Sequence, residues 1–172
     1  MKKTILLTLL FTSLLSFSQV AIGKSSITNT SVSLEFGNEN RGLLLPWVNS
    51  SAAVSGAVDG TIIYDTADKK VKYLKAGSWF DLSVDTTGTV DTSLQDSLTD
   101  SPSAKTAIGT NAETDSTPGI LVLTDTDKAM ILPKVASPHL NIINPSAGMM
   151  VYDTTAHQLV VFNGAVWSFW KP

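Results

Sequence analysis

The feature that most constrains this chain is a seven-residue frame that occurs twice. Residues 60–66 read GTIIYDT and residues 148–154 read GMMVYDT. In both places a tryptophan follows the shared tyrosine at the same distance, at Trp79 and at Trp167. Agreement in order, spacing and residue type is the sequence signature of a duplicated structural unit. Whatever fold one half adopts, the other half is therefore predicted to adopt as well.

The similarity continues through most of both halves. It divides the 172-residue chain into repeat 1 (19–82) and repeat 2 (106–172). Residues 83–105 lie between the repeats and contain 14 Ser, Thr or Asp residues out of 23. Such a composition buries too little apolar surface to offset the entropy of ordering, so this segment is predicted to be a linker. The other matching segments are AIG (21–23) and AIG (107–109), VSLEF (32–36) and ILVL (120–123), RGLLLPWV (41–48) and AMILPKV (129–135), VKYL (71–74) and LVVF (159–162), and GSWF (77–80) and GAVWSF (164–169).

Each repeat carries the signals of short β-strands separated by turns. After the shared frame, a second apolar run leads into a turn at Ala76-Gly77 in repeat 1 and at Asn163-Gly164 in repeat 2. Asn-Gly favours a type I′ hairpin turn, because both central residues of that turn need a positive φ. An aromatic run then supplies a third strand, so each repeat is predicted to end in a three-stranded antiparallel meander.

The first part of each repeat is predicted to be a further hairpin. In repeat 1, residues 32–36 would pair with 43–48, and in repeat 2 residues 119–123 would pair with 129–135. The expected fold class is therefore mainly all-β, with two tandem antiparallel β-meander/hairpin repeats of about five short strands each, joined by a polar linker. A unit of about 60 residues without disulfides is marginally stable alone, so the repeats are expected to pack on each other or on another chain.

The N-terminus has the pattern of a secretory signal peptide over residues 1–18. Lys2 and Lys3 precede an apolar stretch that is too short to span a membrane, and small residues precede a cleavage point before Gln19. We therefore expect export, with no membrane insertion after the signal is removed. The chain has no cysteine, which excludes disulfides, thiol catalysis and thiolate metal sites. Its net charge of −3 gives no reason to expect nucleic acid as a partner.

The segments RGLLLPWV, GTIIYDT, VKYL and GSWF resemble a family of secreted proteins from certain Gram-negative bacteria. That family has a KG-L-L-PR segment, then a loop ending P-x-G-L-L-V-Y-N/D-T, then G-x-W. Similar stretches occur in phage tail-fibre-like and adhesin-like proteins. The resemblance implies a secreted, periplasmic or cell-surface protein. The Arg that commonly follows the Pro in the family is replaced by Trp47 in repeat 1 and by Lys134 in repeat 2, so the two repeats need not bind a partner alike.

Six residues form a candidate ligand-binding site, three in each repeat. One hypothesis is a carbohydrate subsite, in which tyrosine and tryptophan rings stack on a sugar and aspartate accepts its hydroxyl groups. The alternative is structural, with the tyrosine and tryptophan packed inward and the aspartate bonded to nearby backbone where a strand ends. The spacing favours the structural alternative, because it places each aspartate at a strand exit. These residues are Tyr64, Asp65, Trp79, Tyr152, Asp153 and Trp167.

The sequence gives little sign of catalysis or metal binding. The histidines are His139 and His157, neither has a second histidine three or four residues away, and no metal or other cofactor is expected. Residues 124–128 (TDTDK) begin like a calcium-binding loop but lack its later Gly and Glu, which favours a turn. No nucleophile-elbow, phosphate-loop or zinc-protease motif is present. Two aspartates meeting in space, as in glycoside hydrolysis, stay open as a hypothesis.

These observations lead us to expect a secreted structural or adhesion-type β module that is not an enzyme. It would self-associate as a homo-oligomer or bind a surface polysaccharide or protein. A carbohydrate-binding module that uses the aromatic residues of each repeat is the alternative, and an enzyme of unknown class is the second alternative. Unpaired edge strands would favour self-association, aromatic residues facing solvent would favour carbohydrate binding, and a deep polar pocket would favour an enzyme.

Overall fold

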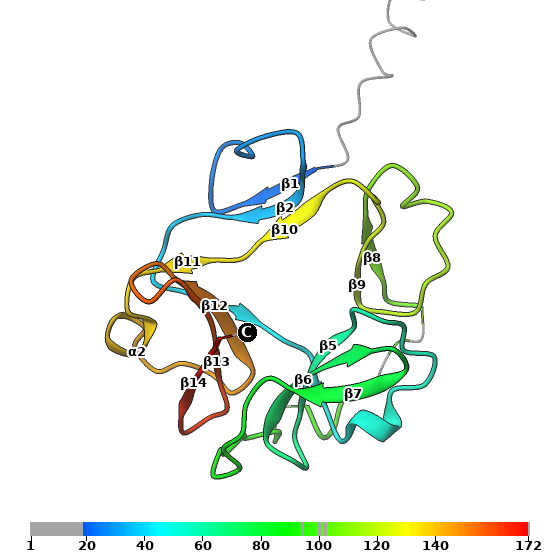
Figure 1. Cartoon of the computed structure of the whole chain (residues 1–172). Helices are drawn as coiled ribbons and strands as arrows, with labels where there is room; N and C mark the ends of the chain where they lie inside the picture. The colour runs from blue at the N-terminus through cyan, green and yellow to red at the C-terminus, as the bar shows by residue number, and fades with distance from the viewer. Residues whose placement is uncertain (1–18, 94, 100, 102, 172) are drawn as a thin grey trace, which may run out of the picture.

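The computed structural model describes residues 19–171 except 94, 100 and 102, so the expected signal peptide (1–18) lies outside the described residues. The fold is mainly β, as predicted, and strands of both repeats surround the middle of the molecule (Figure 1). Repeat 1 contains β1 (Val20–Ile22), β2 (Val32–Phe36), β3 (Leu43–Leu44), β4 (Trp47–Val48), the 3-10 helix η1 (Ser51–Ala53), β5 (Ile62–Asp65), β6 (Lys70–Lys75) and β7 (Ser78–Asp81). Repeat 2 contains β8 (Thr106–Ile108), β9 (Leu121–Leu123), β10 (Ala129–Ile131), β11 (Lys134–Val135), the helix α2 (Pro138–Asn141), β12 (Met149–Asp153), β13 (Gln158–Phe162) and β14 (Trp167–Trp170).

The internal duplication is visible in the strand pairing. β1 pairs in parallel with β2, and β8 pairs in parallel with β9. The strands β5, β6 and β7 form an antiparallel meander, and β12, β13 and β14 form the matching one, as predicted. A short parallel strand joins the edge of each meander, so that Tyr64 lies opposite Trp47 and Tyr152 lies opposite Lys134.

The hairpins predicted for the first part of each repeat are wrong. β2 pairs with β1 and with β10, both in parallel, and β9 pairs in parallel with β8. Each repeat also has seven short strands in the described residues, where about five were expected. In repeat 1 the physical reason lies in β2, whose residues Val32 to Glu35 are all buried. A strand that is buried on both faces is typical of parallel pairing between covered neighbours, whereas a surface hairpin leaves one face in water.

The turns of the two meanders differ. Ala76 and Gly77 both have a positive φ (50° and 71°), which fits the two-residue turn between β6 and β7. In repeat 2, Gly164 has a positive φ and Asn163 does not, so the type I′ prediction for this turn is wrong. Instead, the side-chain oxygen of Asn163 accepts the backbone N–H of Ala165 (2.9 Å) and of Val166 (2.7 Å). Asparagine here organises a longer loop through its side chain.

Part of the segment 83–105 packs against repeat 2. The side-chain amide of Asn163 donates to the backbone carbonyl of Asp85 (3.0 Å) and to its carboxylate (2.8 Å). Val90 lies against the hydrophobic cluster that both repeats share. The segment has no strand among its described residues, yet its first part joins the folded structure. Across the described residues, no helix has both the length and the apolar character needed to cross a membrane.

Candidate oligomerisation interface

Strands of the two repeats complete each other's sheets (Figure 1). β10 of repeat 2 lies beside β2 of repeat 1 in parallel, with Met130 opposite Leu34. β3 of repeat 1 lies beside β12 of repeat 2 in antiparallel, with Leu44 opposite Met149. β3 and β10 are the matching strands of the two repeats. Each repeat therefore contributes the same strand to a sheet of the other repeat.

β3 and β10 use opposite edges for these contacts. The backbone N–H of Leu45, which follows β3, donates to the carbonyl of Gly148 (3.1 Å). The N–H of Ala129 in β10 donates to the carbonyl of Ser31 (2.9 Å). Successive residues of an extended strand direct their backbone groups to opposite edges. Leu45 matches residue 132 in the repeat alignment, which lies three residues beyond Ala129. An odd separation places the two N–H groups on opposite edges of the strand. β3 therefore bonds through one edge and β10 through the other.

The larger hydrophobic core lies between the repeats. Its buried members come from both halves of the chain, and β5 and β6 of repeat 1 face β12 and β13 of repeat 2 there. Burying one large apolar side chain contributes about 1.5 to 3 kcal/mol, so this shared cluster is a principal source of cohesion. The members are Leu45, Tyr64, Val71 and Leu82 from repeat 1 and Ala147, Met150 and Val161 from repeat 2.

Two aromatic side chains also bond across this core. The hydroxyl of Tyr64 donates to the carbonyl of Asn163 at 2.7 Å in a buried environment. The indole N–H of Trp47 donates to the carbonyl of Ala147, also at 2.7 Å. Burial, followed by the charge of neighbouring Asp65, raises the pKa of the Tyr64 hydroxyl, so the hydroxyl keeps its proton and acts as a donor. Both bonds satisfy backbone carbonyls that the strand pairing leaves available.

The first glycine of the repeated frame is required at this contact. Gly148 has a φ of 80°, and a Cβ atom added to it would lie 2.8 Å from the Cβ of Tyr64. A larger residue would therefore meet both a strained backbone and a steric clash. The repeated frame thus places a glycine of repeat 2 directly against the tyrosine of repeat 1.

The candidate site aspartates are buried and hold the backbone. The carboxylate of Asp65 accepts N–H groups from Ala67 and Asp68 (3.1 Å each), and from Ser51 (2.7 Å). Asp65 also lies 3.5 Å from the ammonium of Lys72. This is the structural arrangement that the spacing of the aspartate at the strand exit favours. In addition, each aspartate bonds to the loop that follows the short parallel strand.

Asp153 repeats the same arrangement in repeat 2. Its carboxylate accepts N–H groups from Thr155 (2.7 Å), Ala156 (3.2 Å) and Ser137 (3.1 Å). Burial alone would raise the pKa of Asp153, but these backbone N–H groups and nearby His139 outweigh it, and the pKa lies below its ordinary value. The pKa of Asp65 is also lowered, against the effect of burial, by its backbone donors and by Lys72. Both carboxylates are therefore charged at neutral pH.

The other candidate site residues are dispersed. Tyr152 is half-buried on β12, and Trp79 is half-buried on β7 opposite Leu74. Trp167 is half-buried, stacks at a tilt on Phe162 with ring centroids 5.0 Å apart, and packs on the smaller core cluster. Ligand binding by these six residues stays a prediction. Among the described residues, no group of three or more His, Asp or Glu side chains is placed to hold a metal ion.

Residues 107–171 match the family described as phage tail like trimerisation region. The match covers less than half of the chain and corresponds to repeat 2 from β8 to the end of β14. It supports the tail-fibre-like part of the sequence resemblance and a structural, oligomerising module. Repeat 1 forms the same strands in the same order, so it is a structural counterpart of the matched region. Searches of curated proteins and of solved structures gave no significant match.

Among the residues that join the repeats, Tyr64 was a sequence candidate, whereas Trp47, Asn163 and Leu45 were not. Trp47 and Asn163 provide the cross-repeat bonds, and Leu45 provides part of the shared core. One sequence signal pointed in this direction: Trp47 occupies the position where the resembling family has arginine. A tryptophan at a position that is usually charged indicates a buried contact in this particular chain.

Proposed function

We propose that this chain is an exported structural module of the tail-fibre type that assembles with further copies of itself and attaches to a surface. The observation that carries the proposal is the exchange of β3 and β10, because a sheet of one repeat is completed by a strand of another repeat. The match of residues 107–171 to a trimerisation region supports the same function. In this proposal the chain acts outside the cytoplasm and catalyses no reaction.

The mass of the mature chain (19–172) in solution tests the assembly. Sedimentation equilibrium should give the mass of three chains, because the matched family is a trimerisation region. Dilution should reveal reversible dissociation if the contact is made by strand edges and apolar side chains. A single-chain mass across the whole accessible concentration range would contradict the proposal.

Carbohydrate binding is a second candidate, because aromatic side chains face solvent on the last strands of both meanders. Phe80 on β7 is 44% exposed, and Phe169 and Trp170 on β14 are 42% and 40% exposed. Phe80 stacks on Tyr73 with ring centroids 5.6 Å apart, so its ring is held in place. Ordered aromatic rings that face solvent mark binding surfaces more often than scattered aliphatic residues do.

Titration with a panel of cell-surface polysaccharides tests this second candidate. Trp170→Ala should abolish the binding heat measured by calorimetry and lower the melting temperature only a little, because the ring is partly exposed. Ile143→Ala is the matched control, since Ile143 is an exposed aliphatic residue on a different surface loop. Equal binding by all three proteins, or no binding by the parent chain, would reject carbohydrate binding through these rings.

A further inference from the structure

The contacts between the repeats run in one direction. Repeat 1 offers β2 as the edge for β10, whereas β9, which matches β2, pairs only with β8 among the described residues. Repeat 2 offers β12 as the edge for β3, whereas β5, which matches β12, pairs only with β4 and β6 among the described residues. Each repeat therefore carries one side of this interface without a matching partner among the described strands.

The uncovered half on repeat 2 is apolar. Leu34 on β2 is 1% exposed because it lies between β1 and β10. Leu121 occupies the matching position on β9, since each leucine lies opposite the first residue of the preceding strand in its repeat, and it is 43% exposed. Ile120, the preceding residue, is also exposed. This difference accompanies the strand pairing, since β2 has a second neighbouring strand and β9 has none among the described residues.

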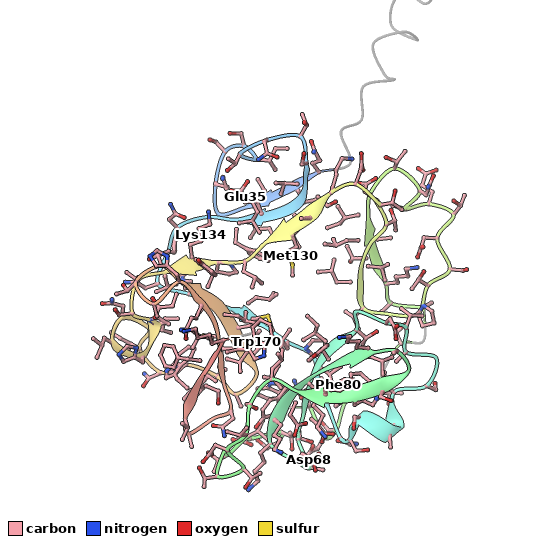
Figure 2. All side chains as sticks on the ribbon, in the orientation of Figure 1. Glu35, Asp68, Phe80, Met130, Lys134 and Trp170 are labelled. Carbon is pink, nitrogen blue, oxygen red and sulfur yellow. The ribbon has the colours of Figure 1, made fainter. Side chains whose placement is uncertain are left out.

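The inner face of the second meander shows the same difference. Tyr64 and Val71 of repeat 1 are fully buried against repeat 2, and the Tyr64 hydroxyl is bonded to Asn163. Their matches in repeat 2, Tyr152 and Leu159, are only half-buried. Met130 on β10 points toward the middle of the ring of strands (Figure 2). Leu159 packs against the shared core but, like Tyr152 and Met130, stays partly exposed, whereas Tyr64 and Val71 of repeat 1 are fully covered.

The uncovered surface on repeat 1 is complementary to the uncovered surface on repeat 2. Gly148 is packed against Tyr64, whereas around the matching Gly60 no described residue beyond its chain neighbours comes within 4 Å of the position that a Cβ would take. Met150 is fully buried, whereas its match Ile62 is half-buried. Leu44 on β3 is an exposed leucine, and among the described strands β3 pairs with β12 alone. In repeat 1, Gly60, Ile62 and Leu44 thus form a surface that corresponds to the surface with which repeat 2 contacts repeat 1.

We propose that a second copy of this chain adds its β3 to the free edge of β9, as β10 adds to β2 within one chain. This inference rests on the proposed self-assembly and specifies the contact that produces it. Transferring the β10–β2 register gives a parallel pair with Leu43 opposite Leu121 and Leu44 opposite Val122. Tyr152 of the first copy then packs against Gly60 of the second copy, as Tyr64 packs against Gly148. The contact is head-to-tail, so the edge of each added copy is available to the next copy.

A second copy fits this surface better than an unrelated partner does. The free edge of β9 can pair with a short parallel strand that has apolar residues on alternate positions. The free edge of β3 can pair with the edge of such a strand. Both elements are present in every copy and are placed on opposite repeats. Inside the chain, β10 and β2, which match β3 and β9, already form such a parallel pair.

Disulfide trapping tests the pairing, because the chain has no cysteine of its own. Leu44→Cys and Val122→Cys are made in separate full-length chains, one of them carrying a tag that changes its mobility. Neighbouring strands lie about 4.8 Å apart and disulfides need about 4.4 to 6.8 Å between Cα atoms. On mixing in a glutathione buffer, the two chains should form a cross-linked pair that reducing agent releases. Ile143→Cys mixed with Leu44→Cys is the control, and it should form no such pair.

The outcomes separate the pairing from the assembly itself. A specific Leu44→Cys/Val122→Cys product in a chain that sediments as an oligomer supports the proposal. An oligomer that yields no more product than the Ile143→Cys control overturns the proposed pairing and leaves self-assembly standing. A chain that sediments as a monomer and yields no product overturns both.

A charge on the β9 edge gives an independent readout. Leu121→Lys should remove the oligomer at concentrations where the parent chain is assembled, because the added copy would bury the ammonium group. The variant should keep the circular dichroism spectrum of the parent chain, since Leu121 is exposed within one chain. An oligomer that persists in Leu121→Lys would overturn the proposed contact.

Discussion

Asp65 and Asp153 show how a single carboxylate organises two segments of backbone. The sequence indicates the role at the strand exit, because an aspartate followed by polar residues is typical of a turn. The bond to Ser51 or Ser137 was not predictable, since those residues precede the aspartates by 14 and 16 positions across an irregular loop. Each repeat therefore uses its aspartate to fix the loop that leads from the short parallel strand to the meander.

The Asp153→Ala substitution should lower the free energy of unfolding by about 1.5 to 3 kcal/mol, because three backbone N–H groups lose a charged acceptor. Urea denaturation of the two proteins measures the difference. Asp127→Ala is the control, since Asp127 is exposed. Equal stability of the Asp153→Ala variant and the parent chain would contradict the structural role.

Glu35 predicts a specific dependence of stability on acid. The ammonium of Lys24 (2.6 Å) and the hydroxyl and N–H of Thr28 hold the pKa of this buried glutamate at about 2, below its ordinary value of 4.5 (Figure 2). A carboxylate with a lowered pKa contributes stability above the unfolded pKa, and this contribution is lost as the pH falls through the folded value.

The Glu35→Gln substitution tests this dependence. The parent chain should be more stable than the variant at neutral pH, and the difference should shrink as the pH falls from about 4.5 to about 2. Denaturant titrations at several pH values measure the difference in the free energy of unfolding between the two proteins. The contributions of the other acidic groups are the same in both proteins and cancel in this difference. Glu39→Gln is the control at an exposed glutamate and should show no such trend. A difference that does not vary with pH would disprove the role of Glu35.

At the scale of elements, local patterns predicted the meanders and missed the exchanged strands. The three strands of each meander follow one another with short turns, so their order is encoded in neighbouring residues. β3 and β10 are apolar runs of two or three residues whose partners lie about 100 positions away in the other repeat. A run of this length indicates a strand but carries no information on which edge it joins.

The bond from Tyr64 to Asn163 measures how firmly β5 is held to the loop between β13 and β14. Tyr64→Phe removes the buried hydroxyl donor and leaves the carbonyl of Asn163 without it, so the free energy of unfolding should fall by about 1 to 2 kcal/mol. Tyr73→Phe is the control, because its ring is half-buried and stacked on Phe80. Equal losses in thermal or urea unfolding of the two variants would contradict a special role for Tyr64.

At the scale of the whole molecule, the two repeats share their sheets and their larger core although the sequence reads as two separate units. The sheets cross between the repeats and the larger core takes side chains from both. The duplication, taken from the sequence, correctly gave the repeated strand order. The duplication did not predict that the repeats exchange strands, because two copies of one pattern can equally form two separate domains.

Cutting the chain within residues 95–99 should therefore leave the two halves together. No strand lies in the described part of this segment, whereas the pairs β2–β10 and β3–β12 and the shared core lie elsewhere. A protease site inserted there should yield two fragments that co-elute under native conditions and unfold in one transition. Residues 106–172 expressed alone should lack a cooperative melt, because β12 loses β3 and the core loses Leu45, Tyr64 and Val71. Fragments that separate on a native column, or a lone repeat 2 that melts like the full chain, would show that the repeats fold independently and that the interlocked interface contributes little.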